Sequence, residues 1–357
     1  MAKCAGQPKY FTKYHHSVAV HLNERGWTRT VRFSEATVAL LTQQGVIQSR
    51  PHTSQWVWLA VCEPLACKAR LFERLECATR KTLKQGVRRW PETWVIRSNV
   101  ALLDWYNQRR ASCALSLATR FFVKHPRTSG GTGTVPAGDV PTAHSHAANV
   151  LVFARDAVVI QRAVDPGTLP RGASLFELRV WALLRRTDCW LFELHRAKTA
   201  TSGLMNQMVQ RGLGAFGFFY ADNIASEAHV REALGRNIYD TRTKPDIAAA
   251  VKLAHGSIRH ELPCGSFVFV GFDFIVDQNA RAWLIEANVK PAFRYADLAS
   301  QFPSPLVRRL ADRAIADLAR VFDGGLDPAP HGPAWIKLPG WEISRGYGAG
   351  GKGDVRF

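Results

Sequence analysis

The chain lacks the features that mark secreted and membrane proteins. Its seven cysteines are scattered without a CxxC pair, a pattern typical of reduced thiols rather than of a disulfide framework or a zinc site. No apolar run approaches the ~18 residues of a membrane span. The first residues, MAKCAGQPKYFTKYHH, contain no apolar signal-peptide core. We therefore expect a soluble, cytoplasmic protein with no membrane partner.

Acidic residues are scarce relative to basic ones. The 357 residues include 47 Lys and Arg but only 29 Asp and Glu, which gives a formal net charge of +18. Such a surface attracts polyanions, whether nucleic acid, anionic membrane or acidic protein tails. The sequence has no zinc-finger spacing, RNA-recognition signature or basic zipper, so nucleic-acid binding would rest on charge alone. At 46% hydrophobic residues, the chain can bury a core spread over two or three packed units.

Segments of helical and strand-like character alternate along the chain and predict a mixed α/β fold. Residues 17–27 are expected to form a short amphipathic helix, residues 93–96 a strand, and residues 304–322 an amphipathic covering helix. The polar residues 136–148, with Pro, Gly, Ser and His, are interpreted as a mobile connection. The Gly-rich end, residues 339–357, is expected to be disordered.

Two strongly apolar runs joined by a polar turn, VFVGFDFIVDQNARAWLIEANVKP, each carry an acid where a core residue is expected. The acids are Asp273 and Glu286, and Asn288 follows two places later. Side chains alternate between the faces of a strand, so Glu286 and Asn288 point the same way. The question is whether Asp273 joins them.

The register of the predicted hairpin decides this. If the turn closes with an even loop at residues 278–279, Asp273 faces Leu284 and Gly271 faces Glu286. Asp273, Glu286 and Asn288 then share one face, whereas an odd loop would break this geometry. Hard oxygen donors on rigid strands suit Mg²⁺, which prefers one or two carboxylates and completes its shell with water and phosphates. The alternative is that each acid meets an arginine in a salt bridge between domains.

This hairpin resembles the metal-binding hairpin of the tubulin tyrosine ligase-like family, whose members are ATP-grasp ligases. Other segments resemble the family's motifs in the same order, over roughly residues 10–340: TRKTLKQGVRRWPETWVI, FFVKHPRTSGGTG, VVIQRAVDPGTL, LFELRVWALL and AWIKL. The resemblance implies an ATP-grasp fold in which a small amino-terminal α/β domain (1–80) precedes a central (81–163) and a carboxy-terminal domain (164–338) that clamp ATP. It also implies activation of a carboxylate as an acyl phosphate, which an amine then attacks.

The resemblance also implies a role for individual residues. Asp273, Glu286 and Asn288 would bind Mg²⁺, with Glu286 and Arg179 acting in catalysis. The residues that would contact ATP are Lys81, Lys124, Gly130, Gly131, Gly133, Gln161, Arg162 and Glu177. Some of these residues have a plainer interpretation: the glycines a flexible connection, Lys81 a solvated surface charge, and Glu177 with Arg179 a surface pair.

Some positions depart from the family pattern. The family's KFDLR is LFELR here, so a basic residue has become Leu175 and an aspartate has become Glu177. No segment matches the family's later LTN stretch. Arg196 or Lys198 could supply the missing basic residue.

Three functions follow in order of preference. The first is an ATP- and Mg²⁺-dependent ligase that adds free tyrosine, glutamate or glycine to a protein tail, above all the acidic tail of tubulin. Such a ligase would be associated with microtubules. The second is a degenerate member that binds tubulin without chemistry, and the third is a nucleic-acid-binding protein. The sequence leaves the amino acid and the acceptor carboxylate open.

Overall fold

The structure is a computed structural model that describes part of the chain. The described residues are 8–12, 17–32, 35–36, 38–41, 54–57, 63–81, 88–112, 121–127, 133–154, 156–164, 175–192, 196–200, 224–225, 231–232, 234–262, 266–289 and 335–338. None of the helices within these ranges has the length and apolar character that a membrane crossing requires.

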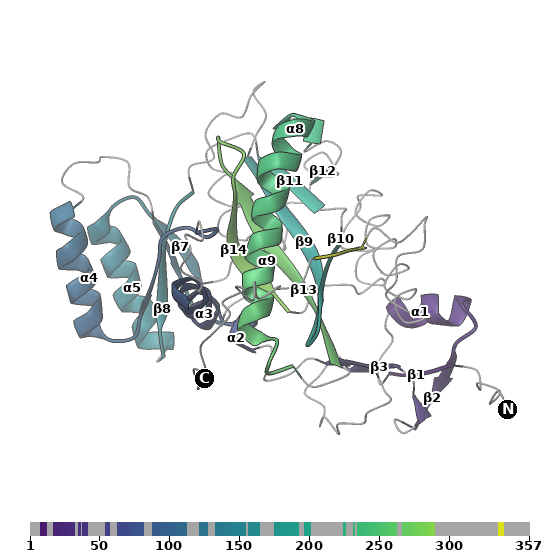
Figure 1. Ribbon diagram of the computed structural model, residues 1–357. Helices are drawn as coiled ribbons and strands as arrows, with labels where there is room; N and C mark the ends of the chain where they lie inside the picture. The colour runs from purple at the N-terminus through teal and green to yellow at the C-terminus, as the bar shows by residue number, and fades with distance from the viewer. Residues whose placement is uncertain are drawn as a thin grey trace, which may run out of the picture.

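A large mixed sheet forms the centre of the molecule (Figure 1). Its main path runs β12-β11-β9-β13-β4-β3-β1-β2; β14 pairs with β13, and β10 pairs with β9 and β15. The strands are β1 (Lys9–Thr12), β2 (Thr28–Thr30), β3 (Val38–Leu41), β4 (Ser54–Val57), β9 (Leu175–Arg185), β10 (Cys189–Phe192), β11 (Arg196–Ala200), β12 (Ile224–Ala225), β13 (Ser266–Val276), β14 (Ala282–Asn288) and β15 (Trp335–Lys337). The amino-terminal strands therefore continue the sheet that carries the acidic hairpin.

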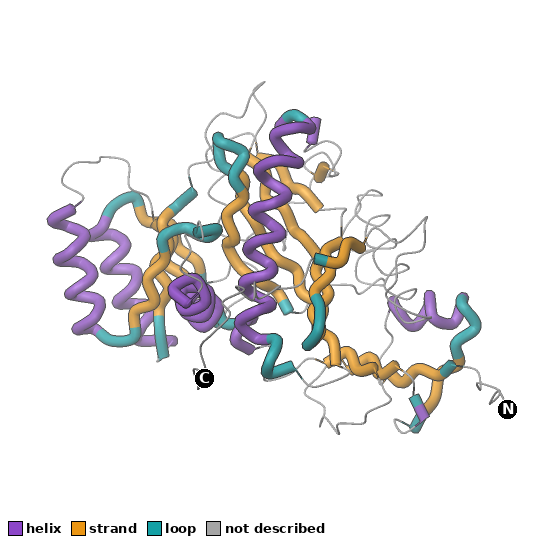
Figure 2. The backbone as a smooth tube through the Cα atoms, in the orientation of Figure 1, coloured by secondary structure: helices purple, strands orange, loops and turns teal. Residues whose placement is uncertain are grey.

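A second, four-stranded sheet lies beside the first, in the order β5-β8-β6-β7. Its strands are β5 (Thr93–Ile96), β6 (Phe121–Lys124), β7 (Thr134–Ala137) and β8 (Val158–Arg162), and two helices cover it, α4 (Asn99–Ser112) and α5 (Val140–Ala154) (Figure 2). Trp94, Trp105 and Phe121 pack edge to face or tilted between sheet and helix, with ring centroids 5.8 to 6.1 Å apart. This smaller body thus has its own apolar core.

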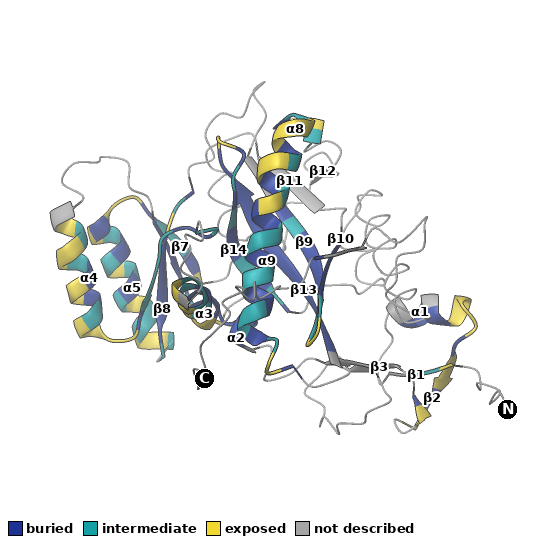
Figure 3. Ribbon diagram, viewed as in Figure 1, coloured by how far each residue is buried: buried dark blue, intermediate teal, exposed yellow. Residues whose placement is uncertain are grey.

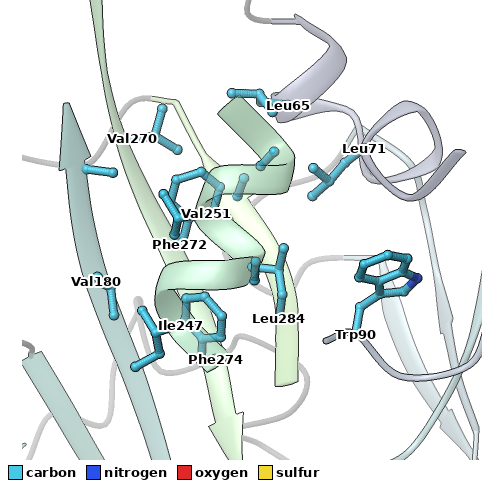
Figure 4. Packing of buried hydrophobic residues seen from close by; sticks show 14 of the residues in the cluster. Leu65, Leu71, Trp90, Val180, Ile247, Val251, Val270, Phe272, Phe274 and Leu284 are labelled. Carbon is cyan, nitrogen blue, oxygen red and sulfur yellow. The ribbon is translucent and has the colours of Figure 1, made fainter. Parts of the chain in front are cut away.

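The principal core lies between the large sheet and three helices. These are α2 (Glu63–Ala66), α3 (Lys68–Lys81) and α9 (Lys244–Ile258), the last preceded by α8 (Arg236–Ile238) and the single π turn η7 (Tyr239–Thr243). Figure 3 shows buried residues along the strands that α9 covers. In Figure 4, Ile247 and Val251 of α9 pack against Phe272, Phe274 and Leu284 of the hairpin. Alternate residues of β13 therefore face α9, and the others face away.

The mixed helix and sheet fold is as predicted, and several elements match. Helix α1 (Ser17–Glu24) ends before Gly26, whose φ of 80° only glycine adopts readily. Strand β5 coincides with the predicted 93–96. The predicted covering helix 304–322 and the tail 339–357 lie outside the described residues, and the domain boundaries stay predictions.

The mobile connection predicted for 136–148 is wrong, because Val140–Ala154 forms α5. Asp139 caps this helix, since its carboxylate accepts a hydrogen bond from the Thr142 N–H at 2.7 Å. Val140, Ala143 and Ala147 are buried at helical spacing, so the small residues of this stretch are a packing face. The Asp-Val-Pro start was a cap signal that the polar composition obscured.

Asp139→Ala is expected to lower the free energy of unfolding by ~1 kcal/mol, because it removes the cap of α5. Asp139→Asn, which keeps an accepting oxygen, is the matched control, and urea unfolding measures both. The hydrogen bond to Thr142 lowers the pKa of Asp139 from its ordinary 3.8. The ionised cap therefore stabilises fully above that value, and its contribution is lost as the pH falls through the lower folded pKa. Equal stabilities of the Ala and Asn variants at neutral pH would contradict the capping role.

Candidate active site

The acidic hairpin closes with an odd loop, so the predicted two-residue turn at 278–279 is wrong. Val276 of β13 pairs with Ala282 of β14, which leaves residues 277–281 as the loop. Asp277 organises it: its carboxylate accepts from the N–H groups of Asn279 and Arg281 at 2.8 and 2.9 Å, and from the Trp283 indole at 2.9 Å. Because one aspartate accepts all three hydrogen bonds, it stabilises a loop that is longer than a two-residue turn.

A β-bulge compensates for the odd loop. Near the loop Phe274 pairs with Leu284, but one step further Asp273 pairs with Glu286, because Ile285 is the extra residue of the bulge. Without the bulge Glu286 would take the place of a core residue facing α9. With it, Ile285 and Glu286 both lie off the α9 face, and Ile285 packs in a small cluster with Val164. The bulge thus places the two acids directly opposite each other.

Asp273 is buried in an ion pair. It is 4% exposed, and its carboxylate accepts two hydrogen bonds from the Arg179 guanidinium, Nε to Oδ1 at 2.6 Å and Nη2 to Oδ2. Arg179 lies directly opposite Asp273 on β9, and its neighbours Leu178 and Val180 belong to the core on the other face. The bidentate geometry gives the strongest form of Arg–carboxylate pairing.

Glu286 faces a second cation, Lys68, at 3.3 Å between Oε2 and Nζ. Lys68 is the first residue of α3 and only 6% exposed, and its N–H donates to the Pro126 carbonyl at 2.9 Å. The first residue of α3 is therefore joined to both sheets. The sequence prediction missed Lys68; a lysine flanked on both sides by apolar residues, LACKA, was the available signal.

The salt-bridge alternative is thus present for both acids, with Arg179 for Asp273 and a lysine instead of an arginine for Glu286. The oxygen donors nevertheless suit Mg²⁺. Two opposed carboxylates and the amide of Asn288, which pairs with Gly271 next along the ladder, offer hard ligands from two strands. The described residues hold no group of three or more His, Cys, Asp or Glu side chains arranged for a metal. A cation here would therefore need water or phosphate oxygens to complete its shell.

The smaller sheet contributes a buried polar chain. Lys124, 2% exposed at the end of β6, donates to the Gln161 side-chain oxygen at 2.7 Å, and the Gln161 amide donates to Thr93 Oγ1 at 3.1 Å. Two predicted nucleotide-binding residues are thereby in direct contact. Gly133 has φ 74°, and its carbonyl accepts the His125 N–H at 2.7 Å, directly beside the end of β6. Gly130 and Gly131 lie outside the described residues.

His125, directly after β6, lies close enough to Lys68 of α3 for the lysine charge to act on it. Burial lowers its pKa, Asp156 opposes this, and the charges of Lys68 and Arg127 lower it further. Its Nδ1 accepts the Arg127 N–H at 3.2 Å. The imidazole is therefore neutral at physiological pH and carries its proton on Nε2.

Three other predicted residues stand apart from this cluster. Lys81 is the last residue of α3, about 20 Å along the helix from Lys68 at 1.5 Å per residue. The Arg162 side chain is 56% exposed and lies 3.8 Å from Glu92. Glu177 pairs in register with Lys198 of β11, as Arg179 pairs with Arg196, so the two basic residues suggested as replacements lie beside β9.

Residues 222–320 match the Tubulin-tyrosine ligase family. Among curated proteins, tubulin glycylase 3C of Tetrahymena thermophila is 23% identical over 181 residues, which cover 43% of this chain and 16% of the relative. Tubulin glycylase 3B of the same organism is 25% identical over 95 residues, or 26% of this chain and 8% of the relative. The chain therefore matches only a small part of each of these proteins.

Arg179→Met is expected to lower the free energy of unfolding by about 3–5 kcal/mol in buffer with a metal chelator, because it leaves the buried Asp273 carboxylate without its counter-charge. Urea unfolding measures the loss. The double variant Asp273→Leu/Arg179→Met removes both charges and should recover most of it. A single variant as stable as the wild type would show that the pair does not hold Asp273 in the folded protein.

Proposed function

We propose that this chain, which matches the Tubulin-tyrosine ligase family over residues 222–320, is an ATP-dependent ligase that joins an amino acid to a protein tail. The observation that carries the proposal is the pair of opposed carboxylates, Asp273 and Glu286, each faced by a buried or half-buried cation. Two acids at this spacing repel each other unless a positive charge lies between or beside them. Their placement on rigid strands suits a site that handles polyphosphate through a divalent cation.

Asp273, Glu286 and Asn288 would hold Mg²⁺, which when bound neutralises charge on the phosphates of ATP and orients them. Without Mg²⁺, the ammonium of Lys68 supplies the positive charge beside Glu286. A divalent cation at Glu286 would repel Lys68 and leave its ammonium to meet a phosphate oxygen. Lys68 therefore takes the role that the sequence prediction assigned to Lys81.

Lys124 and Gln161 provide the opposite wall of the proposed nucleotide site. Lys124 is a buried ammonium that donates to the Gln161 oxygen, and its positive charge would attract an anionic ligand. Gly133, whose φ is positive, lies beside His125 directly after Lys124, and its lack of a side chain would let phosphate approach the backbone there. Arg179 would steady an anionic group of the substrate while remaining next to Asp273.

For the protein substrate we propose an acidic tail, that of tubulin, and for the donor glycine. Both similar proteins bear the name tubulin glycylase, and the formal charge of +18 favours an acidic polypeptide. The departures at Leu175 and Glu177 favour a second candidate, a protein that binds tubulin without catalysis.

Mass spectrometry of tubulin tails separates these two functions. After incubation with the protein, Mg-ATP and a mixture of glycine, glutamate and tyrosine, we expect a mass increase of the tails by glycine residues. Glu286→Gln keeps the shape of the side chain but removes its charge, and should abolish the increase. Tubulin that is bound but unmodified by the wild type would favour the non-catalytic function, and an unaffected Glu286→Gln variant would remove Glu286 from the site.

Lys68→Met should raise the Kd for Mg-ATP by about 10- to 100-fold, the loss expected for a charge-assisted hydrogen bond. Isothermal titration calorimetry measures this, and Arg80→Met, at the exposed far end of α3, is the control for a lost positive charge. If Lys81→Met weakens binding and Lys68→Met does not, the phosphate contact belongs to Lys81 as the sequence suggested.

A further inference from the structure

A buried carboxylate outside the acidic hairpin binds two arginines at once. Asp246, in the first turn of α9, is 2% exposed. The Arg281 guanidinium donates to it through Nε at 2.7 Å and Nη2 at 2.9 Å, and Arg89 Nε lies 2.6 Å from its Oδ1. The Ala282 N–H adds a fourth contact at 3.3 Å. Burying three charges costs desolvation energy, so folding stability alone does not explain why this cluster is present.

The two arginines come from different parts of the molecule. Arg281 is the last loop residue of the acidic hairpin, directly before β14. Arg89 lies on the segment that leads from α3 into β5, the first strand of the smaller sheet. Burial lowers the pKa of Arg89 and the Asp246 carboxylate opposes this shift. Asp246 is therefore the counter-charge that lets the segment carry a half-buried arginine.

The same segment is hydrogen-bonded to the hairpin. The Leu284 N–H of β14 donates to the Arg89 carbonyl at 2.8 Å, only two residues before Glu286. Trp90, 1% exposed, packs in the same core as Leu284 (Figure 4). The turn η7, directly before α9, also contacts the hairpin loop, since Thr243 Oγ1 donates to the Ala280 carbonyl at 2.7 Å. Two of these contacts thus meet β14 at Leu284, near Glu286, and the third meets the hairpin loop.

We propose that Asp246 is a positioning residue for the nucleotide site: by binding Arg281 and Arg89 together, it fixes the acidic hairpin relative to the chain that enters the smaller sheet. This inference rests on the proposed function, because the site it positions is the one between Glu286 on the hairpin and Lys124 on the smaller sheet. Asp246 touches neither of them in the described contacts; it acts through Arg89 and the β14 edge.

Two variants separate positioning from stability. Asp246→Asn keeps the size of the side chain but leaves two arginines without their counter-charge. The triple variant Asp246→Leu/Arg89→Met/Arg281→Met removes all three charges, a replacement that commonly restores folding stability. Glu261→Gln is the control, since it neutralises an acid just after α9 that pairs with Arg74 at a more exposed place.

Each variant is measured for urea stability, for Kd of Mg-ATP by calorimetry, and for amide exchange at Leu284 in the nucleotide-free protein. Asp246→Asn should raise the Kd about tenfold or more and speed exchange at Leu284, while Glu261→Gln changes neither. The triple variant should regain stability but not affinity. The proposal is overturned if folded Asp246→Asn binds Mg-ATP like the wild type, if its Leu284 exchange is unchanged, or if the triple variant regains affinity. Failure of the wild type itself to bind Mg-ATP would instead overturn the proposed function.

Discussion

The opposed carboxylates of Asp273 and Glu286 are the constraint on which the rest of the structure depends. Acids on facing positions of adjacent strands destabilise each other unless cations stand beside them. Arg179 satisfies this need from the next strand and Lys68 from the start of a helix, so the site requires β9, β13, β14 and α3 to meet at one place. The two acids and their two cations are together nearly neutral. A bound divalent cation would take over the neutralisation of the acids, and its phosphates would pair with the freed lysine.

Backbone irregularity, and not alternation alone, brings these acids together. The alternation of apolar and polar residues predicted that Asp273, Glu286 and Asn288 share a face, and they do. It predicted this through an even loop that is absent; the odd loop 277–281 and the bulge at Ile285 together restore the parity. Two such shifts cancel in the pattern of apolar residues, which is why the face could be predicted from the sequence but the directly opposed pairing could not.

The other elements and site residues differed in how far the sequence alone could predict them. Strand β5, the end of β6 at Lys124 and the stop of α1 before Gly26 follow from local apolar runs and turn residues. Helix α5 was predicted as a connection because its sequence is polar, although Asp139 before Val140 is a recognisable helix cap. Lys68 could not be chosen over Lys81 from local pattern, because both lie on one helix and only tertiary contacts show which end meets the hairpin. The role of Asp246 could not be predicted either, because the two arginines that it binds are distant from it in sequence.

The most direct measurement of the central claim is a crystal structure of the protein with Mn²⁺ and a non-hydrolysable ATP analogue, with the metal located by its anomalous signal. The account predicts that the metal contacts oxygens of Asp273 and Glu286, and that Lys68 has left Glu286 for a phosphate oxygen. A nucleotide bound elsewhere, with Lys68 and Arg179 still paired to the two acids and no metal beside them, would show that the hairpin is a structural ion-pair cluster and contradict the account.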